Sequence, residues 1–254
     1  MQEVITIPTQ SDNYIYLFIH EKEGMVIDPL EVQSVLHCIR QRHIRLSVIM
    51  NTHHHFDHIA GNQQLKKATG CEIVGPDVHI SGIDRVVKDG DIIRLGQKEM
   101  HVIATPGHTQ TSVCYYLPGE TEECDGIVWT GDTLFVGGCG RLFGNMPHVL
   151  WESLQKLVAL PNDTRLYCGH DYTVENFSFA LSIEPNNKMI KERLKTVKKL
   201  QQMQEPTVSS TIGEEKETNV FLRAHTQQIK QAIGMKRASD VDVFAELRRR
   251  KDSF

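Results

Sequence analysis

The 254-residue sequence has no apolar run of about 18 residues, the length that a membrane-spanning helix needs. Its first residues, MQEVITIPTQSDNY, also lack the basic start, apolar stretch and small-residue cleavage site of a secretory signal. From these two absences we expect a cytoplasmic protein that does not enter a membrane.

Cysteines at C-x-x-C spacing are missing too. The six cysteines are scattered along a chain without an export signal, so we expect reduced thiols rather than disulfides. They are Cys38, Cys71, Cys114, Cys124, Cys139 and Cys168.

Excess positive charge is absent: 28 basic residues against 32 acidic ones leave a net charge of -4, which argues against general nucleic-acid binding. With 40% hydrophobic and 24% charged residues, the composition excludes a disordered or fibrous class. The length fits one large domain, or a domain of about 150 residues with a smaller one beside it.

The first part of the chain predicts a strand-rich start. Short β runs cover residues 3–9, 13–20 and 24–29, and residues 31–43 carry apolar side chains at helical spacing. Further on, four apolar runs each end in a turn that bears a histidine or an aspartate: LSVIM before His53, HVIA before His108, GIVW before Asp132 and TRLYC before His170. In sheets flanked by helices, functional groups gather beyond the carboxyl ends of strands, so these four ends can converge on one site.

After about residue 173 the pattern becomes helical. Helices are predicted over residues 173–183, 187–202 and 240–254, with a polar stretch at 206–219. We therefore expect an α/β domain at 1–172 and a helical domain at 173–254. The basic residues of the second helix are interpreted as a solvated outer face; they are Lys191, Arg193, Lys195, Lys198 and Lys199.

The stretch NTHHHFDHIAGN carries the densest cluster of possible metal ligands. His53 and His55 lie two residues apart, so in an extended segment their imidazoles point the same way and can hold one ion. Asp57 and His58 follow where the chain can turn toward a neighbouring ion. Together with the strand-end residues this gives five imidazoles and two carboxylates, a donor set that suits Zn, Fe or Mn better than Mg or Ca.

At these residues the sequence resembles the metallo-β-lactamase superfamily, whose T-H-x-H-x-D-H pattern matches residues 52–58. It resembles the glyoxalase II family, the hydroxyacylglutathione hydrolases, more narrowly. The supporting stretches are DNYIYL, TPGHT, GDTLFVGGCGRLF, CGHDYT, NVFLR and the closing RRRKDSF. The resemblance implies an αββα sandwich with a C-terminal helical domain.

The resemblance also implies roles for particular residues. It assigns His53, His55 and His108 to a first metal, and Asp57, His58 and His170 to a second. Asp132 and a hydroxide would bridge the two ions, which makes Asp57 and Asp132 the catalytic carboxylates. The residues expected to bind substrate are Arg141, Phe143, Tyr172, Arg248 and Lys251.

The chain departs from the family pattern at three places: Asp171 stands for a glutamate, Phe143 for a tyrosine, and residues 144–148 diverge. His54 is expected to face solvent rather than bind metal, and His79 and His101 to be packed or exposed. Asp28, at the end of an apolar run, could orient a ligand histidine through its second ring nitrogen.

The function implied is metal-dependent hydrolysis of an S-(2-hydroxyacyl)glutathione, S-D-lactoylglutathione foremost, to glutathione and D-lactate, the last step of methylglyoxal detoxification. We expect a monomer with two divalent ions, zinc first and iron or manganese as alternatives. Two other functions stay open, a glutathione persulfide dioxygenase with a single iron and a metal-binding protein without turnover. No serine or cysteine nucleophile is needed, because a metal supplies hydroxide near neutral pH.

Overall fold

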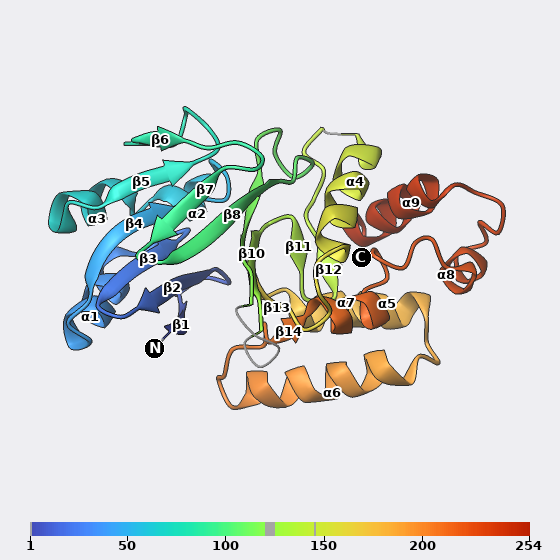
Figure 1. The fold of residues 1–254 in the computed structure, drawn as a ribbon. Helices are drawn as coiled ribbons and strands as arrows, with labels where there is room; N and C mark the ends of the chain where they lie inside the picture. Colours follow the sequence, from blue (N-terminus) through green and yellow to red (C-terminus); the bar gives the residue numbers. More distant parts are fainter. Residues whose placement is uncertain (1, 120–124, 145) are drawn as a thin grey trace.

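The computed structural model describes residues 2–119, 125–144 and 146–254, and its core is a pair of six-stranded sheets (Figure 1). Residues of the two inner faces form one buried cluster, in which Phe18 of the first sheet meets Trp129 of the second with ring centroids 5.7 Å apart. Helices cover the outer faces. The αββα sandwich expected from the resemblance is therefore present.

The first sheet has the order β1-β2-β3-β4-β5-β6, with antiparallel pairs from β1 to β3 and parallel pairs from β3 to β6. Its strands are β1 (Gln2–Pro8), β2 (Tyr14–His20), β3 (Glu23–Ile27), β4 (Arg45–Met50), β5 (Glu72–Gly75) and β6 (Arg85–Val86). β2 is buried on both faces, since Phe18 faces the other sheet and Leu17 faces the helices. The third predicted strand ends early because Asp28 has φ 50°, in the left-handed region.

The second sheet has the order β14-β13-β10-β9-β8-β7, in which only the β10–β13 pair is parallel. Its strands are β7 (Ile92–Leu95), β8 (Lys98–Ala104), β9 (Val113–Leu117), β10 (Ile127–Gly131), β13 (Arg165–Cys168) and β14 (Ser210–Thr211). A small hairpin of β11 (Leu134–Phe135) and β12 (Gly138–Cys139) follows β10. The apolar runs predicted before His108, Asp132 and His170 lie in β8, β10 and β13.

Two layers of helices flank the sheets (Figure 1). Buried side chains of α1 (Val32–Gln41) and α3 (Asn62–Thr69) pack on the outer face of the first sheet, and α2 (Phe56–Ile59) is a single turn before α3. The remaining helices are α4 (Pro147–Val158), α5 (Thr173–Ile183), α6 (Lys188–Gln202), α7 (Ile212–Thr218), α8 (Gln227–Ala232) and α9 (Asp240–Asp252). In the described part of the chain, no helix is long and apolar enough to cross a bilayer.

The three predicted C-terminal helices correspond to α5, α6 and α9, but residues 206–219 are more than a polar connection. They contain β14, which pairs with β13 and so extends the second sheet, and α7, which Thr211 and Glu214 begin with a capping box. Five cysteines are free thiols, while Cys124 lies outside the described residues. The division at residue 172 stays a prediction.

Candidate metal centre

The strand ends converge as expected. His53 and His55 follow β4, His108 lies between β8 and β9, Asp132 follows β10 and His170 follows β13. Gly131 makes one close approach possible: its φ is 48°, and a Cβ there would lie 2.3 Å from Thr52 Oγ1. Only glycine lets the turn before Asp132 lie against the histidine-rich loop.

The first group of ligand atoms comes from His53, His55 and His108. His55 Nδ1 lies 3.0 Å from His53 Nε2 and 3.1 Å from His108 Nε2. Burial lowers the pKa of His53 well below its usual value and that of His108 to about 4. Both imidazoles are thus neutral at pH 7, which is the form that binds a metal.

The second group comes from Asp57, His58 and His170. Asp57 and His58 lie on the single turn α2, and their nearest oxygen and nitrogen are 3.6 Å apart. His170 Nε2 is 3.3 Å from His58 Nε2 and 3.4 Å from Asp57 Oδ2. The three ligand atoms lie close enough together to share one ion.

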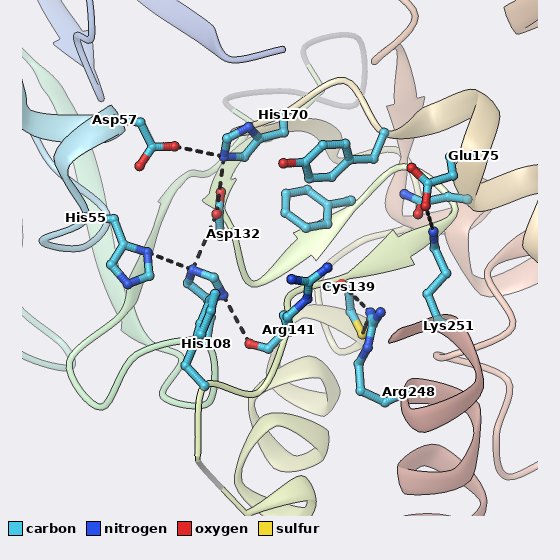
Figure 2. Close-up of a pocket in the computed structure, with 14 residues that line it drawn as sticks. His55, Asp57, His108, Asp132, Cys139, Arg141, His170, Glu175, Arg248 and Lys251 are labelled. Carbon is cyan, nitrogen blue, oxygen red and sulfur yellow. Dashed lines mark hydrogen bonds and ion pairs between the residues drawn. The ribbon is translucent and has the colours of Figure 1, made fainter. Parts of the chain in front are cut away.

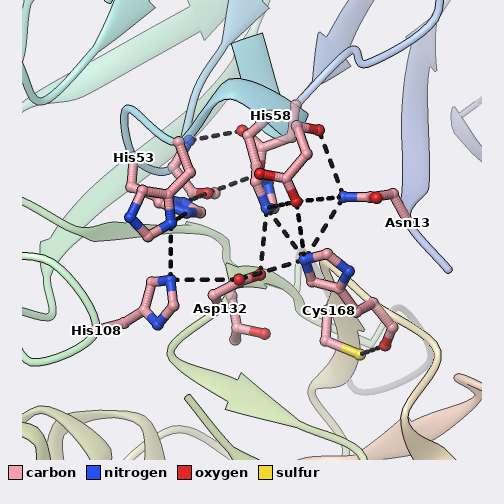
Figure 3. A network of polar contacts seen from close by, with 12 residues as sticks. Asn13, His53, His58, His108, Asp132 and Cys168 are labelled. Carbon is pink, nitrogen blue, oxygen red and sulfur yellow. Dashed lines mark hydrogen bonds and ion pairs between the residues drawn. The ribbon is translucent and has the colours of Figure 1, made fainter. Parts of the chain in front are cut away.

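Asp132 lies between the two groups (Figure 3). Its Oδ2 is 3.4 Å from His108 Nε2 and 3.3 Å from His170 Nε2, and its Oδ1 is 3.4 Å from His58 Nε2. Although burial raises the pKa of Asp132, the charges of His58 and His170 hold it well below its usual range. An ionised carboxylate therefore faces both groups.

Asp28 supports two of these histidines. Its Oδ2 lies 3.0 Å from His58 Nδ1 and accepts a 2.6 Å hydrogen bond from Thr52 Oγ1, which is itself 3.0 Å from His53 Nδ1. Each ring is thereby oriented with Nε2 toward the centre. This is the geometry that metal-binding histidines usually have, with the second nitrogen held by a carboxylate or another acceptor.

The other ligands are held by contacts that the sequence did not predict. His108 Nδ1 is 3.1 Å from the carbonyl oxygen of Arg141, and His170 Nδ1 is 2.9 Å from Asp12 Oδ1. The Asn13 amide donates to Asp57 Oδ2 at 3.1 Å. Asp12 and Asn13 begin the DNYIYL stretch, which marked the family but gave no local sign of a role because His170 is 158 residues away.

The expectation that His54 faces solvent is only half right. Its ring is partly exposed, but its Nδ1 is buried 3.2 Å from Asp77 Oδ2. Asp77 also accepts a 2.8 Å hydrogen bond from Thr111 Oγ1, three residues after His108. It therefore connects the loops that carry the first group. His79 is exposed beside Asp77, and His101 is partly buried in β8.

These donors fit divalent ions. Each group offers three ligand atoms within 4.8 Å of one another, and most of the residues are buried. In addition, Asp132 Oδ1 is buried with no hydrogen-bond partner among the described residues. Imidazoles and carboxylates in this arrangement suit Zn, Fe or Mn.

A cavity of about 360 Å³ opens beside the centre (Figure 2). The metal end of this cavity is lined by His55, Asp57, His108, Asp132 and His170. Its other end, called the tail end below, is lined by Cys139, Arg141, Glu175, Asn176, Arg248 and Lys251. The aromatic residues Phe135, Phe143 and Tyr172 complete the lining.

At the tail end, Arg248 and Lys251 line one cavity, but each is already paired with a carboxylate of the chain. Arg248 is buried, donates to the Cys139 carbonyl oxygen at 2.9 Å and pairs with Asp252 at 2.8 Å. Lys251 is only 7% exposed and pairs with Glu175. Both cations thus have carboxylate partners within the chain, and their proposed role in binding substrate stays a prediction.

The remaining predicted substrate residues are placed differently. Tyr172 stacks on His170 with centroids 5.0 Å apart, so it both packs and lines the cavity. Phe143 is exposed and lies edge-on to the rings of His55 and His108, at 5.5 and 5.2 Å. Arg141 is largely exposed, with its Nε 3.7 Å from Asp252 Oδ1.

The fold is that of the metallo-β-lactamase superfamily. The family model of that name matches residues 8–81 and 73–170, and the model "Hydroxyacylglutathione hydrolase C-terminus" matches 171–254. The protein named hydroxyacylglutathione hydrolase from Chelativorans sp. (strain BNC1) is 44% identical over 99% of both chains. Its namesake from Brucella ovis is 46% identical over 96% of this chain and 95% of its own. The chain belongs to the hydroxyacylglutathione hydrolase family.

Solved structures agree on the fold. ETHE1 from Myxococcus xanthus is 25% identical, with a TM-score of 0.66 over 98% of this chain and 96% of its own. A metallo-β-lactamase from Staphylococcus aureus is 20% identical, with a TM-score of 0.69 over 98% of this chain and 71% of its own.

Proposed function

We propose that the chain hydrolyses the thioester of an S-(2-hydroxyacyl)glutathione, S-D-lactoylglutathione foremost, to glutathione and the free 2-hydroxy acid. The observation that carries the proposal is the single cavity that joins the two ligand groups to Arg248 and Lys251. The naming of relatives that are 44% and 46% identical over nearly the whole chain supports it.

In this proposal His53, His55 and His108 would hold one divalent ion, Asp57, His58 and His170 would hold a second, and Asp132 would face both. Zinc is the first candidate, and iron or manganese also suit these donors. When bound, such ions supply Lewis-acid chemistry and a nucleophile from water near neutral pH.

The protein's own residues contribute orientation and charge. Asp57 and Asp132 offset part of the positive charge of the ions, and Asp28 and Asp12 fix the rings of His58 and His170. In the reaction a C–O bond forms at the acyl carbon and the C–S bond breaks. A thiolate is a good leaving group and takes its proton from solvent after it has left, so no side chain has to act as a general acid.

The tail end would bind the thiol part of the substrate. Arg248 and Lys251 would hold the glycine carboxylate, and Arg141 would add a largely exposed positive charge. The Tyr172 hydroxyl would hydrogen-bond the glutathione peptide; burial raises the pKa of Tyr172, so the hydroxyl keeps its proton. Phe143 would pack beside the first ligand group.

The test combines elemental analysis with kinetics. We expect two metal ions per chain and hydrolysis of S-D-lactoylglutathione, followed by release of free glutathione. One ion per fully active chain would contradict the binuclear assignment, and no hydrolysis by the metal-loaded protein would contradict the function.

A second candidate function is a glutathione persulfide dioxygenase with a single iron. The similarity to ETHE1 over nearly the full chain favours it. Oxygen uptake with glutathione persulfide, together with one iron per chain, would identify this activity. A metal-binding protein without turnover would show neither reaction. The monomeric state and cytoplasmic location remain predictions.

A further inference from the structure

Glu175 holds a carboxylate inside the cavity that the proposed function assigns to an anionic substrate. It belongs to the first turn of α5, and its side chain is 60% exposed. Its Oε1 pairs with Lys251 Nζ, which comes from α9 and is only 7% exposed (Figure 2). The exposed carboxylate of Glu175 is thus the ion-pair partner of a nearly buried lysine at the tail end.

The charges at the tail end explain why this pair matters. Three cations, Arg141, Arg248 and Lys251, meet two carboxylates, Glu175 and Asp252, which leaves one net positive charge. Asp252 is already engaged by Arg248 from the same helix, so Glu175 is the carboxylate whose removal frees a cation. Loss of Glu175 would double the net positive charge at this end.

The geometry lets Glu175 leave Lys251 without disturbing either helix. A carboxylate in the first turn of a helix is favoured by the helix dipole, so Glu175 is stable there with or without its lysine. Lys251 is held by burial and lies 5.6 Å from the centroid of the Phe254 ring. Its position therefore does not depend on Glu175 alone.

We propose that Glu175 is a specificity-determining residue that competes with the carboxylate of the thiol part of the substrate for Lys251. The inference rests on the proposed function. A substrate carboxylate can pair with Lys251 only by displacing Glu175. The binding free energy that it gains is therefore smaller than it would be from an unpaired lysine. A substrate without that carboxylate loses little affinity, because Lys251 then stays paired with Glu175. Glu175 thus weakens both the binding of glutathione thioesters and the preference for their charge.

The test is Glu175→Gln, which keeps the shape and removes the charge. We expect KM for S-D-lactoylglutathione to fall by about 3- to 10-fold. This range lies between the typical contribution of an exposed ion pair and that of a hydrogen bond to a charged group. The turnover number should stay the same, because the contact is present before and during the reaction. With the analogue whose glycine carboxylate is a carboxamide, KM should not change.

Glu246→Gln is the matched control. Glu246 also lies on α9 and pairs with basic residues of that helix, Arg249 and Arg250. Glu246 and both arginines lie outside the cavity lining. The same change in net charge should leave KM for both substrates unchanged. This separates local competition from a general charge effect.

An unchanged or higher KM in a folded Glu175→Gln protein would overturn the inference, as would an equal fall in KM for the carboxamide. If the wild-type protein hydrolyses S-D-lactoylglutathione and the variant behaves like it, only the inference fails. If the metal-loaded wild-type protein hydrolyses neither thioester, the proposed function fails.

Discussion

The two ends of the cavity are built on opposite principles. At the metal end, histidine nitrogens and carboxylate oxygens converge on one place. The other ring nitrogens of His58 and His170 are held by Asp28 and Asp12. At the tail end, Arg248 and Lys251 already have carboxylate partners within the chain. One end is arranged to receive positive ions, whereas the other must exchange an internal partner for an external one. Changes at the metal end should therefore abolish chemistry, and changes at the tail end should shift affinity.

The largest effect is expected for Asp132→Ala, because this carboxylate faces both ligand groups. We expect loss of both ions and a fall in turnover of more than about 100-fold, the upper end of what loss of a supporting contact costs. Elemental analysis and kcat measure this. His170→Ala should instead empty mainly the second group, and full activity with two ions in the Asp132 variant would remove the shared role.

Asp28→Asn tests whether the supporting contacts act through the metals. Asp28 orients His58 directly and His53 through Thr52, so we expect metal affinity to fall about 10- to 100-fold. Competition with a chelator measures the affinity, and Asp89→Asn, on an exposed turn, is the control. An unchanged affinity with reduced stability would mean that Asp28 only supports the fold.

At the tail end, Arg248→Ala combined with Lys251→Ala should raise KM by about 10- to 100-fold, roughly 1.4 to 2.7 kcal/mol. The turnover number and both metals should be retained, and the wild-type KM should rise with salt. Because Arg248 also holds the Cys139 carbonyl oxygen, the melting temperature has to be compared. Arg249→Ala with Arg250→Ala is the control. A wild-type KM in the folded double variant would remove the binding role.

The smallest effect is expected for Tyr172→Phe, at the ring that stacks on His170 and lines the cavity. Loss of one hydrogen bond to the substrate should weaken apparent affinity by about 1 kcal/mol. Steady-state kinetics measure it, with thermal unfolding to exclude a change in packing against His170. Identical kinetics would leave Tyr172 with a packing role only.

The sequence predicted the metal end better than the tail end for a physical reason. β4 of the first sheet and β10 and β13 of the second end on the same side of the sandwich, so short polar motifs after these strands were enough to bring His53, Asp132 and His170 together. The partners of Lys251 and His170 come from residues 76 and 158 positions away, and no local periodicity marks them. Similarly, β14 is too short for a strand pattern and exists because β13 offers it an edge.

The short strand β14 also determines how the molecule could be divided. A protein cut after residue 172 would lose β14, and β13 would become an open edge with unpaired backbone groups. The same cut would remove Phe177 and Phe221, which are fully buried in the cluster shared with the sheets, and so would uncover the apolar side chains of that cluster that lie before residue 172. Exposed edges and apolar surface are templates for aggregation. The N-terminal part of the chain is therefore a poor candidate for separate expression, and a fusion partner is better attached at a terminus than inserted between the two predicted domains.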